Sequence, residues 1–200
     1  MAPLRIAAVV LAAGKSQRMR RNKLLLRIGG RTVLDRVLSS IESSRVEERF
    51  VVLGHRPEDL RPIVEAHAAE AVFNPDYEEG MTSSFKTGLS RVSVNAAFLC
   101  LGDQAVLDPV LMDGMIDAME AHPEALLVSP VYEGRRGHPV LFRDTLFSEV
   151  MTLGQEDTMK DVVDGYGDRH MEVEGDVWCT LDMDTPEDYE MIRERLAAEP

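Results

Sequence analysis

Residues 5–31 read RIAAVVLAAGKSQRMRRNKLLLRIGGR, and this stretch decides the fold. Its first part, residues 5–12, is a short apolar run that predicts a buried β-strand. Gly14 then opens a polar loop, and apolar residues at helical spacing predict a helix over residues 32–44. A strand, a glycine-bearing loop and a helix in this order are typical of the first unit of a parallel α/β sheet.

The same alternation of short apolar runs and helical segments continues along the chain. It predicts further strands over residues 50–53, 71–73, 96–101 and 125–129, and helices after Pro57, over 83–91 and over 109–121. After Pro130 the rhythm changes to a Gly- and Arg-rich loop over 132–138, a possible edge strand over 139–142, a strand region over 173–181 and a last helix over 187–197. Asp184 or Thr185 is available as the N-cap of that helix. We therefore expect one mixed α/β domain over residues 1–200.

Composition limits the classes of function. The 200 residues carry a net charge of −13, which argues against nonspecific binding to nucleic acid or to an anionic membrane. No run approaches the roughly 20 apolar residues of a membrane helix, and the apolar start lacks a small-residue cleavage site. Cys100 and Cys179 form no metal-finger pattern. We expect a cytoplasmic protein with free thiols and with no nucleic acid or membrane partner.

Positive charge is concentrated in residues 15–31. This segment carries +7 and no acidic residue, and the rest of the chain carries −20; its cations are Lys15, Arg18, Arg20, Arg21, Lys23, Arg27 and Arg31. Exposed backbone N–H groups beside Lys and Arg are what a polyphosphate site needs, whereas the alternative is a solvated loop that serves solubility. The P-loop pattern fails because Val10 stands where it requires glycine, and the dinucleotide pattern fails because Gly14 is the turn's only glycine.

Four blocks of sequence resemble one family, in the same order. They are VLAAG (10–14) with Ser16, Arg18-Met19 and NKLL (22–25), then NPDYEEGMTSS (74–84) with Gly88-Leu89, then LGDQ (101–104), and last GHP (137–139) with DMDTPED (182–188). Together they resemble the MobA-like nucleotidyltransferases, closest to the molybdenum cofactor cytidylyltransferases. The resemblance spans almost the whole chain and implies a Rossmann-like, three-layer α/β fold with a mostly parallel sheet.

That resemblance also implies a site for a nucleoside triphosphate and Mg²⁺ at the carboxyl ends of the strands. Leu11, Ala12, Ala13 and Gly14 would form the nucleotide loop, Arg18 and Lys23 would hold the triphosphate, and Asp103 and Asp184 would bind the metal. Mg²⁺ prefers one or two carboxylates together with phosphate oxygens and water. On the residues alone, Asp103 is equally well read as a turn residue after a strand and Asp184 as a helix N-cap.

Other blocks would serve the base and the acceptor. By the resemblance, Ser84 would lie at the base and ribose, although Thr82 and Ser83 also suit the start of a helix. His138 would face the acceptor, with Arg135 and Arg136 able to meet its phosphate or pterin; a structural turn histidine is the alternative. Ala13 and Gln104 resemble the cytidylyl-transferring branch. Arg20 and Ala105 depart from the family pattern, which usually has glycine and proline there.

The activity that follows is transfer of CMP from CTP to a phosphorylated, pterin-type acceptor, molybdenum-carrying molybdopterin, with release of pyrophosphate. The acceptor phosphate is itself the nucleophile, so no Ser-His-Asp or Cys-His arrangement is needed. A molybdenum hydroxylase or its maturation factor is the partner expected downstream. Two alternatives stay open: a cofactor-binding chaperone of the same fold without turnover, and a transferase acting on a sugar phosphate or another phosphate monoester.

Overall fold

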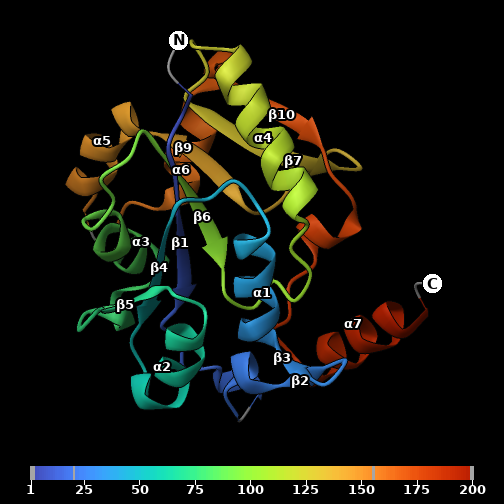
Figure 1. The fold of residues 1–200 in the computed structure, drawn as a ribbon. Helices are drawn as coiled ribbons and strands as arrows, with labels where there is room; N and C mark the ends of the chain where they lie inside the picture. Colours follow the sequence, from blue (N-terminus) through green and yellow to red (C-terminus); the bar gives the residue numbers. More distant parts are fainter. Residues whose placement is uncertain (1–2, 20, 155, 199–200) are drawn as a thin grey trace.

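A central β-sheet organises the molecule (Figure 1), whose computed structural model describes residues 3–19, 21–154 and 156–198. Among these residues, eight strands form the main sheet, in the order β10-β7-β9-β6-β1-β4-β5, with β8 paired to β7. The strands are β1 Ile6–Ala12, β4 Glu48–Leu53, β5 Glu70–Phe73, β6 Ala96–Leu101, β7 Leu127–Tyr132, β8 Arg135–Arg136, β9 Val140–Arg143 and β10 His170–Glu174. A separate hairpin joins β2 Arg27–Ile28 to β3 Arg31–Thr32.

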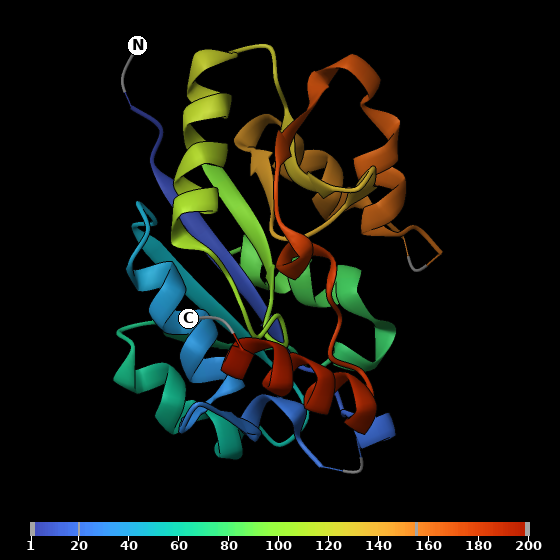
Figure 2. The same ribbon diagram turned by 90° about the vertical axis from the view of Figure 1, so that its right-hand side faces the viewer.

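Helices cover both faces of this sheet. They are α1 Val33–Glu42, α2 Pro57–Ala66, α3 Met81–Leu89, α4 Pro109–Ala121, α5 Phe147–Thr152, α6 Met159–Gly165 and α7 Pro186–Ala198. Alternate residues of β1 point to opposite faces: Ala8 and Val10 pack with α1, α2 and α4, whereas Ala7 and Val9 pack with α3, α5 and α6. Figure 2 shows these two sets of helices on either side of the sheet. The expected three-layer, mostly parallel α/β fold is confirmed.

The centre of the sheet sets the place of the site. β1 pairs in parallel with β4 on one side and with β6 on the other. The chain reaches β4 through α1 on one face, and it reaches β6 through α3 on the opposite face. Such a change of direction is a topological switch point, and ligands of open α/β sheets bind there, outside the carboxyl ends of the strands.

The structure corrects the second half of the sequence analysis. Residues 139–142 do not form an edge strand, because β9 pairs antiparallel with both β6 and β7 and so lies inside the sheet. The strand expected over residues 173–181 is wrong for most of its length: β10 spans His170–Glu174, and a 3-10 helix over Val177–Thr180 follows. The sequence analysis also missed α5 and α6.

A third, smaller core fixes the C-terminal segment beneath the basic loop. Met19, Leu26 and Ile28 pack there against Trp178 and Tyr189. The Tyr189 hydroxyl also donates a hydrogen bond to the Arg27 carbonyl, at 2.8 Å. These contacts bring residues 182–184 beside the loop that follows β1, although 160 residues of chain separate them.

Helix α3 lies unusually close to the sheet. A Cβ built on Gly88 would come within 2.3 Å of Val9 Cγ1 and 2.8 Å of Val52 Cγ2. Helix α3 begins at Met81 after Gly80, whose φ of 108° favours glycine. Thr82 and Ser83 therefore stand in the first turn and are not the caps that the sequence indicated.

The start of α7 settles which residue caps it. The Thr185 hydroxyl accepts from the Asp188 amide at 3.2 Å, and the Asp188 carboxylate accepts from the Thr185 amide at 2.8 Å. This reciprocal pair is a capping box. Thr185 is the N-cap, so the side chain of Asp184 is available for another role.

In the described part of the chain, no helix is long and apolar enough to cross a membrane.

Candidate active site

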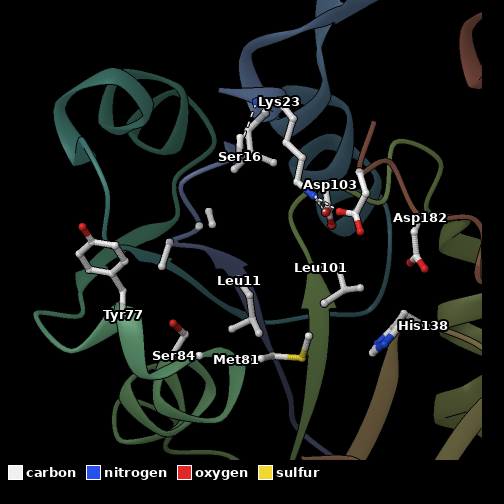
Figure 3. A pocket seen from close by; sticks show the side chains of 16 residues that line it. Leu11, Ser16, Lys23, Tyr77, Met81, Ser84, Leu101, Asp103, His138 and Asp182 are labelled. Carbon is white, nitrogen blue, oxygen red and sulfur yellow. Dashed lines mark hydrogen bonds and ion pairs between the residues drawn. The ribbon is translucent and has the colours of Figure 1, made fainter. Parts of the chain in front are cut away.

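A cavity of about 510 Å³ opens at the carboxyl ends of β1 and β6 (Figure 3). Nine of the residues that the sequence singled out line it: Leu11, Ala12, Ala13, Gly14, Lys23, Ser84, Asp103, His138 and Asp184. Gly80 and Met81, from the loop that the resemblance places around the base and ribose, line it as well. Its other lining residues, which carried no expected role, are Ser16, Leu24, Tyr77, Leu101 and Asp182. Arg18 and Gln104 are not on the wall, but both contact residues that are.

The loop after β1 forms one wall and leaves room at Gly14. A Cβ built on Gly14, which lines the cavity, would meet no protein atom within 4 Å, so the space beside this residue is open. The loop is held from within: the Lys23 amide donates to the Ser16 hydroxyl at 3.2 Å, and the Leu24 amide donates to the Asn22 side chain at 3.1 Å. Lys23 therefore begins a 3-10 turn with a fixed backbone and a side chain directed into the cavity.

Two carboxylates meet at one ammonium group. Lys23 Nζ contacts Asp103 Oδ2 and lies 2.8 Å from Asp184 Oδ1 (Figure 3). Burial works to lower the pKa of Lys23, but the charges and hydrogen bonds of Asp103 and Asp184 outweigh it and raise that pKa. The hydrogen bond from Lys23 lowers the pKa of Asp184. Asp103 follows β6, whereas Asp184 precedes α7, so the fold joins groups that lie 81 residues apart.

Arg18 reaches the same carboxylate from outside. Its Nη2 lies 3.0 Å from Asp184 Oδ2, and its side chain is 70% exposed. Other cations of the basic segment pair away from these carboxylates. Lys15 pairs with Glu78 at 2.6 Å, whereas Arg31 pairs with Asp35 on α1. The segment thus contains two cations that reach Asp184, Arg18 and Lys23, and others that do not; Arg20 lies outside the described residues.

Asp182 is a third carboxylate on the cavity wall. Burial raises its pKa, and the neighbouring charges of Asp103 and Asp184 raise it further. Sequence reasoning quoted this residue within the Asp-x-Asp stretch and gave it no role. The signal was present, because the stretch that carries Asp184 must bring Asp182 close to the same place.

His138 separates this cavity from a second one. Its Nδ1 is buried and has no hydrogen-bond partner among the described residues. Burial lowers the pKa of His138, against the charges of Asp182 and Asp103. The backbone is fixed from two sides: the His138 amide donates to the Cys179 carbonyl at 2.8 Å, and Gln104 Nε2 donates to the His138 carbonyl at 2.8 Å. Gln104 itself is buried. Its contacts fit a positioning residue for the 137–139 loop.

The wall opposite the carboxylates comes from α3 and the segment before it. The buried Asn74 amide donates to the hydroxyls of Ser83 at 3.1 Å and Ser84 at 3.2 Å. Tyr77 and Met81 stand beside Ser84 along this wall (Figure 3). An aromatic ring, a thioether and a hydroxyl suit the flat face and polar rim of a nucleoside.

The second cavity, of about 360 Å³, shares Met81 and His138 with the first. Its walls are mostly apolar; the shared pair apart, they comprise Leu99, Ser129, Arg136, Gly137, Val140, Phe142, Met159, Lys160, Val163 and Asp164. Arg136 is held by Glu172 at 2.7 Å and by Asp164 at 3.3 Å. Lys160, on the same wall, forms no ion pair with another described residue, so an anionic ligand would meet it without displacing a carboxylate.

The donor set fits a hard divalent cation. Among the described residues, no group of three or more His, Cys, Asp or Glu side chains is arranged to hold a metal. Asp103 and Asp184 nevertheless direct oxygens to one point, where they already hold a cation. Two carboxylates completed by substrate phosphates and water are a typical Mg²⁺ environment. Ala105, which departs from the family pattern, is buried beside this point, and its carbonyl accepts from Arg36 Nε at 3.1 Å.

Comparison with known proteins shows the family to which the chain belongs. The model of the family "MobA-like NTP transferase domain" matches residues 8–173. The chain is 27% identical over 197 residues to the molybdenum cofactor cytidylyltransferase of Escherichia coli (strain K12), covering 95% of this chain and 96% of that protein. It is 28% identical over 204 residues to the purine catabolism protein PucB of Bacillus subtilis (strain 168), covering 96% and 98% respectively.

Two solved structures have a similar fold. The crystal structure of Rv0371c from Mycobacterium tuberculosis H37Rv superposes with a TM-score of 0.84 at 27% identity, covering 97% of this chain and all of that one. A complex of Rv0371C with manganese superposes with a TM-score of 0.76 at 28% identity, covering 95% and 98%. The family model spans most of the chain, and the chain therefore belongs to the MobA-like NTP transferase family, as a nucleotidyltransferase of that kind.

Proposed function

We propose that this protein transfers CMP from CTP to a phosphorylated, pterin-type acceptor, molybdenum-carrying molybdopterin, and releases pyrophosphate. The observation that carries the proposal is the convergence of Asp103 and Asp184 on one cation, beside a loop whose Gly14 leaves open space. This combination provides a place for a metal and a triphosphate at the switch point of the sheet.

Asp103 and Asp184 are the residues that would hold Mg²⁺. When bound, the metal would supply charge stabilisation to the triphosphate, and the manganese complex of the similar mycobacterial protein supports a divalent cation here. The chain's own residues bind and orient the nucleotide. Leu11 to Gly14 lie along it, Arg18 and Lys23 offset the charge of the β- and γ-phosphates, and Tyr77 with Ser84 borders the nucleoside.

The second cavity is the proposed acceptor site. Its apolar walls suit a heterocycle, and Lys160 and the region of His138 suit the phosphate that this heterocycle carries. An oxygen of that phosphate attacks the α-phosphorus of CTP, the bond to the β-phosphate oxygen breaks, and pyrophosphate leaves with the bonding electrons. The protein provides position and charge rather than a nucleophile of its own.

The base and the acceptor are the finer parts of the proposal. Ala13 narrows the loop by one methyl group compared with glycine, which is worth about 1–3 kcal/mol of discrimination at most. The similarity to the molybdenum cofactor cytidylyltransferase of E. coli supports cytidine as the base and molybdenum cofactor as the acceptor. We place the reaction in the cytoplasm, since Cys100 and Cys179 are free and buried, and a molybdenum hydroxylase or its maturation factor would take the product.

The test is pyrophosphate release from each of the four NTPs, with molybdenum-loaded molybdopterin and with sugar phosphates as acceptors. CTP with the pterin acceptor should give the highest kcat/KM, and Asp103→Asn should serve as the inactive control. A preference for GTP or ATP would overturn the cytidylyl assignment, and turnover of a sugar phosphate alone would overturn the acceptor. Tight binding of the cofactor without any pyrophosphate release would instead identify a chaperone.

A further inference from the structure

Lys23 uses the same oxygens that a metal would use. Its ammonium contacts Asp103 Oδ2 and lies 2.8 Å from Asp184 Oδ1, and only 17% of its side chain is exposed. A divalent cation at these two carboxylates needs the position that the ammonium holds. Two cations at one point repel each other strongly where water is largely excluded. Lys23 and a metal therefore compete for Asp103 and Asp184.

The same side chain has a second possible partner. Lys23 belongs to the loop that borders the open space at Gly14, where a triphosphate would lie. Its backbone is fixed by the hydrogen bond to Ser16, but its side chain is a flexible four-carbon stem that ends in a point charge. A lysine of this kind can exchange one anion for another without any movement of the backbone.

We propose that Lys23 is an exchangeable counter-ion that couples metal binding to nucleotide binding. It neutralises Asp103 and Asp184, and it transfers to the triphosphate when the metal and the nucleotide enter together. The transfer to a triphosphate rests on the proposed function, whereas the competition for the carboxylates does not. Because such coupling is reciprocal, the metal binds weakly without the nucleotide and the nucleotide binds weakly without the metal.

Arg18 does not have the same role. It reaches Asp184 alone, through the other oxygen at 3.0 Å, and its side chain is largely exposed. Exposed ion pairs contribute little because water screens them. Lys23, in contrast, bridges both carboxylates from a mostly buried position. The geometry thus predicts a graded competition with the metal, in which Lys23 dominates, Arg18 is minor and Lys15, which pairs with Glu78, takes no part.

The experiment measures Mn²⁺ binding without nucleotide, by the electron paramagnetic resonance signal of free Mn²⁺. Lys23→Met should bind Mn²⁺ at least tenfold more tightly than the wild type, because the carboxylates lose their internal cation. Arg18→Met should improve binding less, and Lys15→Met, which removes the same charge from the same loop, should stay within twofold of the wild type. Unchanged or weaker Mn²⁺ binding by Lys23→Met would overturn the proposal. Equal gains in Mn²⁺ affinity from all three variants would also overturn it, because they would mean that the total positive charge of the loop, and not the position of Lys23, opposes the metal.

A double variant separates competition from misfolding. Lys23→Met combined with Asp184→Asn should lose the gain in Mn²⁺ affinity, because the freed carboxylate is no longer present. Retention of the gain would place the metal elsewhere and contradict the proposal. Circular dichroism melts identify a variant that has not folded, and Lys23→Gln, which keeps a polar end group, then takes the place of Lys23→Met with the same expected result.

A nucleotide arm tests the coupling. With α,β-methylene CTP, which cannot be cleaved at the transferred bond, the Mn²⁺ affinity of the wild type should rise by a larger factor than that of Lys23→Met. Equal factors would contradict the transfer of Lys23 to the triphosphate. The nucleotide-free series is independent of substrate identity, so a protein that fails to use CTP can still confirm the competition, and an active cytidylyltransferase can still refute it.

Discussion

Two regions of this molecule place a nitrogen-bearing side chain between two carboxylates, and their roles differ. In the cavity, the Lys23 ammonium bridges Asp103 and Asp184. Between α1 and α2, the His67 ring bridges Asp35 at 2.8 Å and Glu42 at 2.9 Å. Both ring nitrogens of His67 thus face carboxylate oxygens of the same helix, α1.

The surroundings distinguish the two bridges. Asp103 follows a strand and Asp184 precedes a helix, and both open on a cavity large enough for a substrate. Asp35 and Glu42 are two turns apart on one helix, and His67, at the end of α2, clasps that helix to its neighbour. A side chain held between two carboxylates is thus a structural clasp where two helices pack, and it marks a candidate site where the carboxylates open on a cavity. The following changes test that distinction.

The largest effect is expected from Asp103→Asn. Loss of one anionic oxygen removes charge at the metal position, so turnover should fall by about 10²- to 10³-fold. Helices and core are not involved, and the melting temperature should stay close to that of the wild type. Initial rates of pyrophosphate release at fixed Mg²⁺ measure the effect. A variant with near-normal rates at limiting Mg²⁺ would remove Asp103 from the metal site.

Arg18→Ala and Arg31→Ala compare one cation from each region. Arg18 pairs with Asp184 from outside the cavity wall, and its loss should raise the KM for the nucleotide by about tenfold, because a charge-assisted hydrogen bond to phosphate contributes roughly 1.5–3 kcal/mol. Arg31 pairs with Asp35 beside the His67 clasp, and its loss should leave KM within twofold. Steady-state kinetics of both variants give the two KM values. Equal effects of the two substitutions on KM would mean that the basic segment attracts the nucleotide through its total charge and not through Arg18 in particular.

Gly14→Ala tests the space at the cavity, with Gly114→Ala as its control. Neither added Cβ meets a protein atom within 4 Å, so neither variant should be destabilised by a clash. The methyl at position 14 takes room from the nucleotide and should raise KM about tenfold. The methyl at 114 lies in α4 and should raise the free energy of unfolding by roughly 0.5–1 kcal/mol without changing the kinetics. A kinetically silent Gly14→Ala would mean that the substrate does not approach the loop.

His67→Gln breaks the clasp. The histidine is 8% exposed, and its removal leaves two carboxylates with fewer partners, so the free energy of unfolding should fall by about 1–2 kcal/mol. The variant that folds should keep its kcat and KM within twofold at 25 °C. Urea unfolding followed by circular dichroism gives the first value and the pyrophosphate assay the second. A large change in KM would link the clasp to the site.

The smallest expected effect is on the stability of the protein at acid pH. The hydrogen bond from Arg31 is the main cause that lowers the pKa of Asp35 below its ordinary value of 3.8. The stabilisation from this group is therefore present above that ordinary value and is lost as the pH falls through the folded-state value. Asp35→Asn should cost under about 1 kcal/mol at pH 7 and should flatten the fall in stability between about pH 5 and pH 3. Urea unfolding at each pH measures this. If the free energy of unfolding of Asp35→Asn fell with decreasing pH as steeply as that of the wild type, the prediction would be contradicted.

The sequence was most informative where local signals agree. Strand β6 and helix α4 have the expected bounds, because an apolar run and a proline at the first helical position define them locally. Strand β9 was misread as an edge strand because its two neighbours, β6 and β7, are chosen by long-range pairing that a four-residue run does not encode. The short helices α5 and α6 were missed for a similar reason, since their packing and not their periodicity stabilises them.

For the site, the sequence pattern located nine cavity residues, and the chain's topology supplied the rest. That Lys23 bridges Asp103 and Asp184 follows from the packing of α7 beneath the basic loop, which no local pattern reveals. Tyr77 and Asp182 stood within quoted motifs, but their approach to the cavity depends on segments distant in sequence. Gln104 was expected at the base, whereas its amide contacts the His138 carbonyl, so its proposed influence on the base would act through that loop.

Gly88 has a consequence for how this scaffold can diversify. No side chain fits between α3 and Val9 of β1. The helix that carries Met81 and Ser84 therefore already packs against the sheet as closely as its backbone allows. The depth of the proposed nucleotide pocket then cannot be adjusted by moving the helix closer to the sheet. An enzyme engineer who wants a roomier pocket for a purine should therefore shorten the side chains at the exposed end of α3 and in the loop after β1, and should leave position 88 untouched.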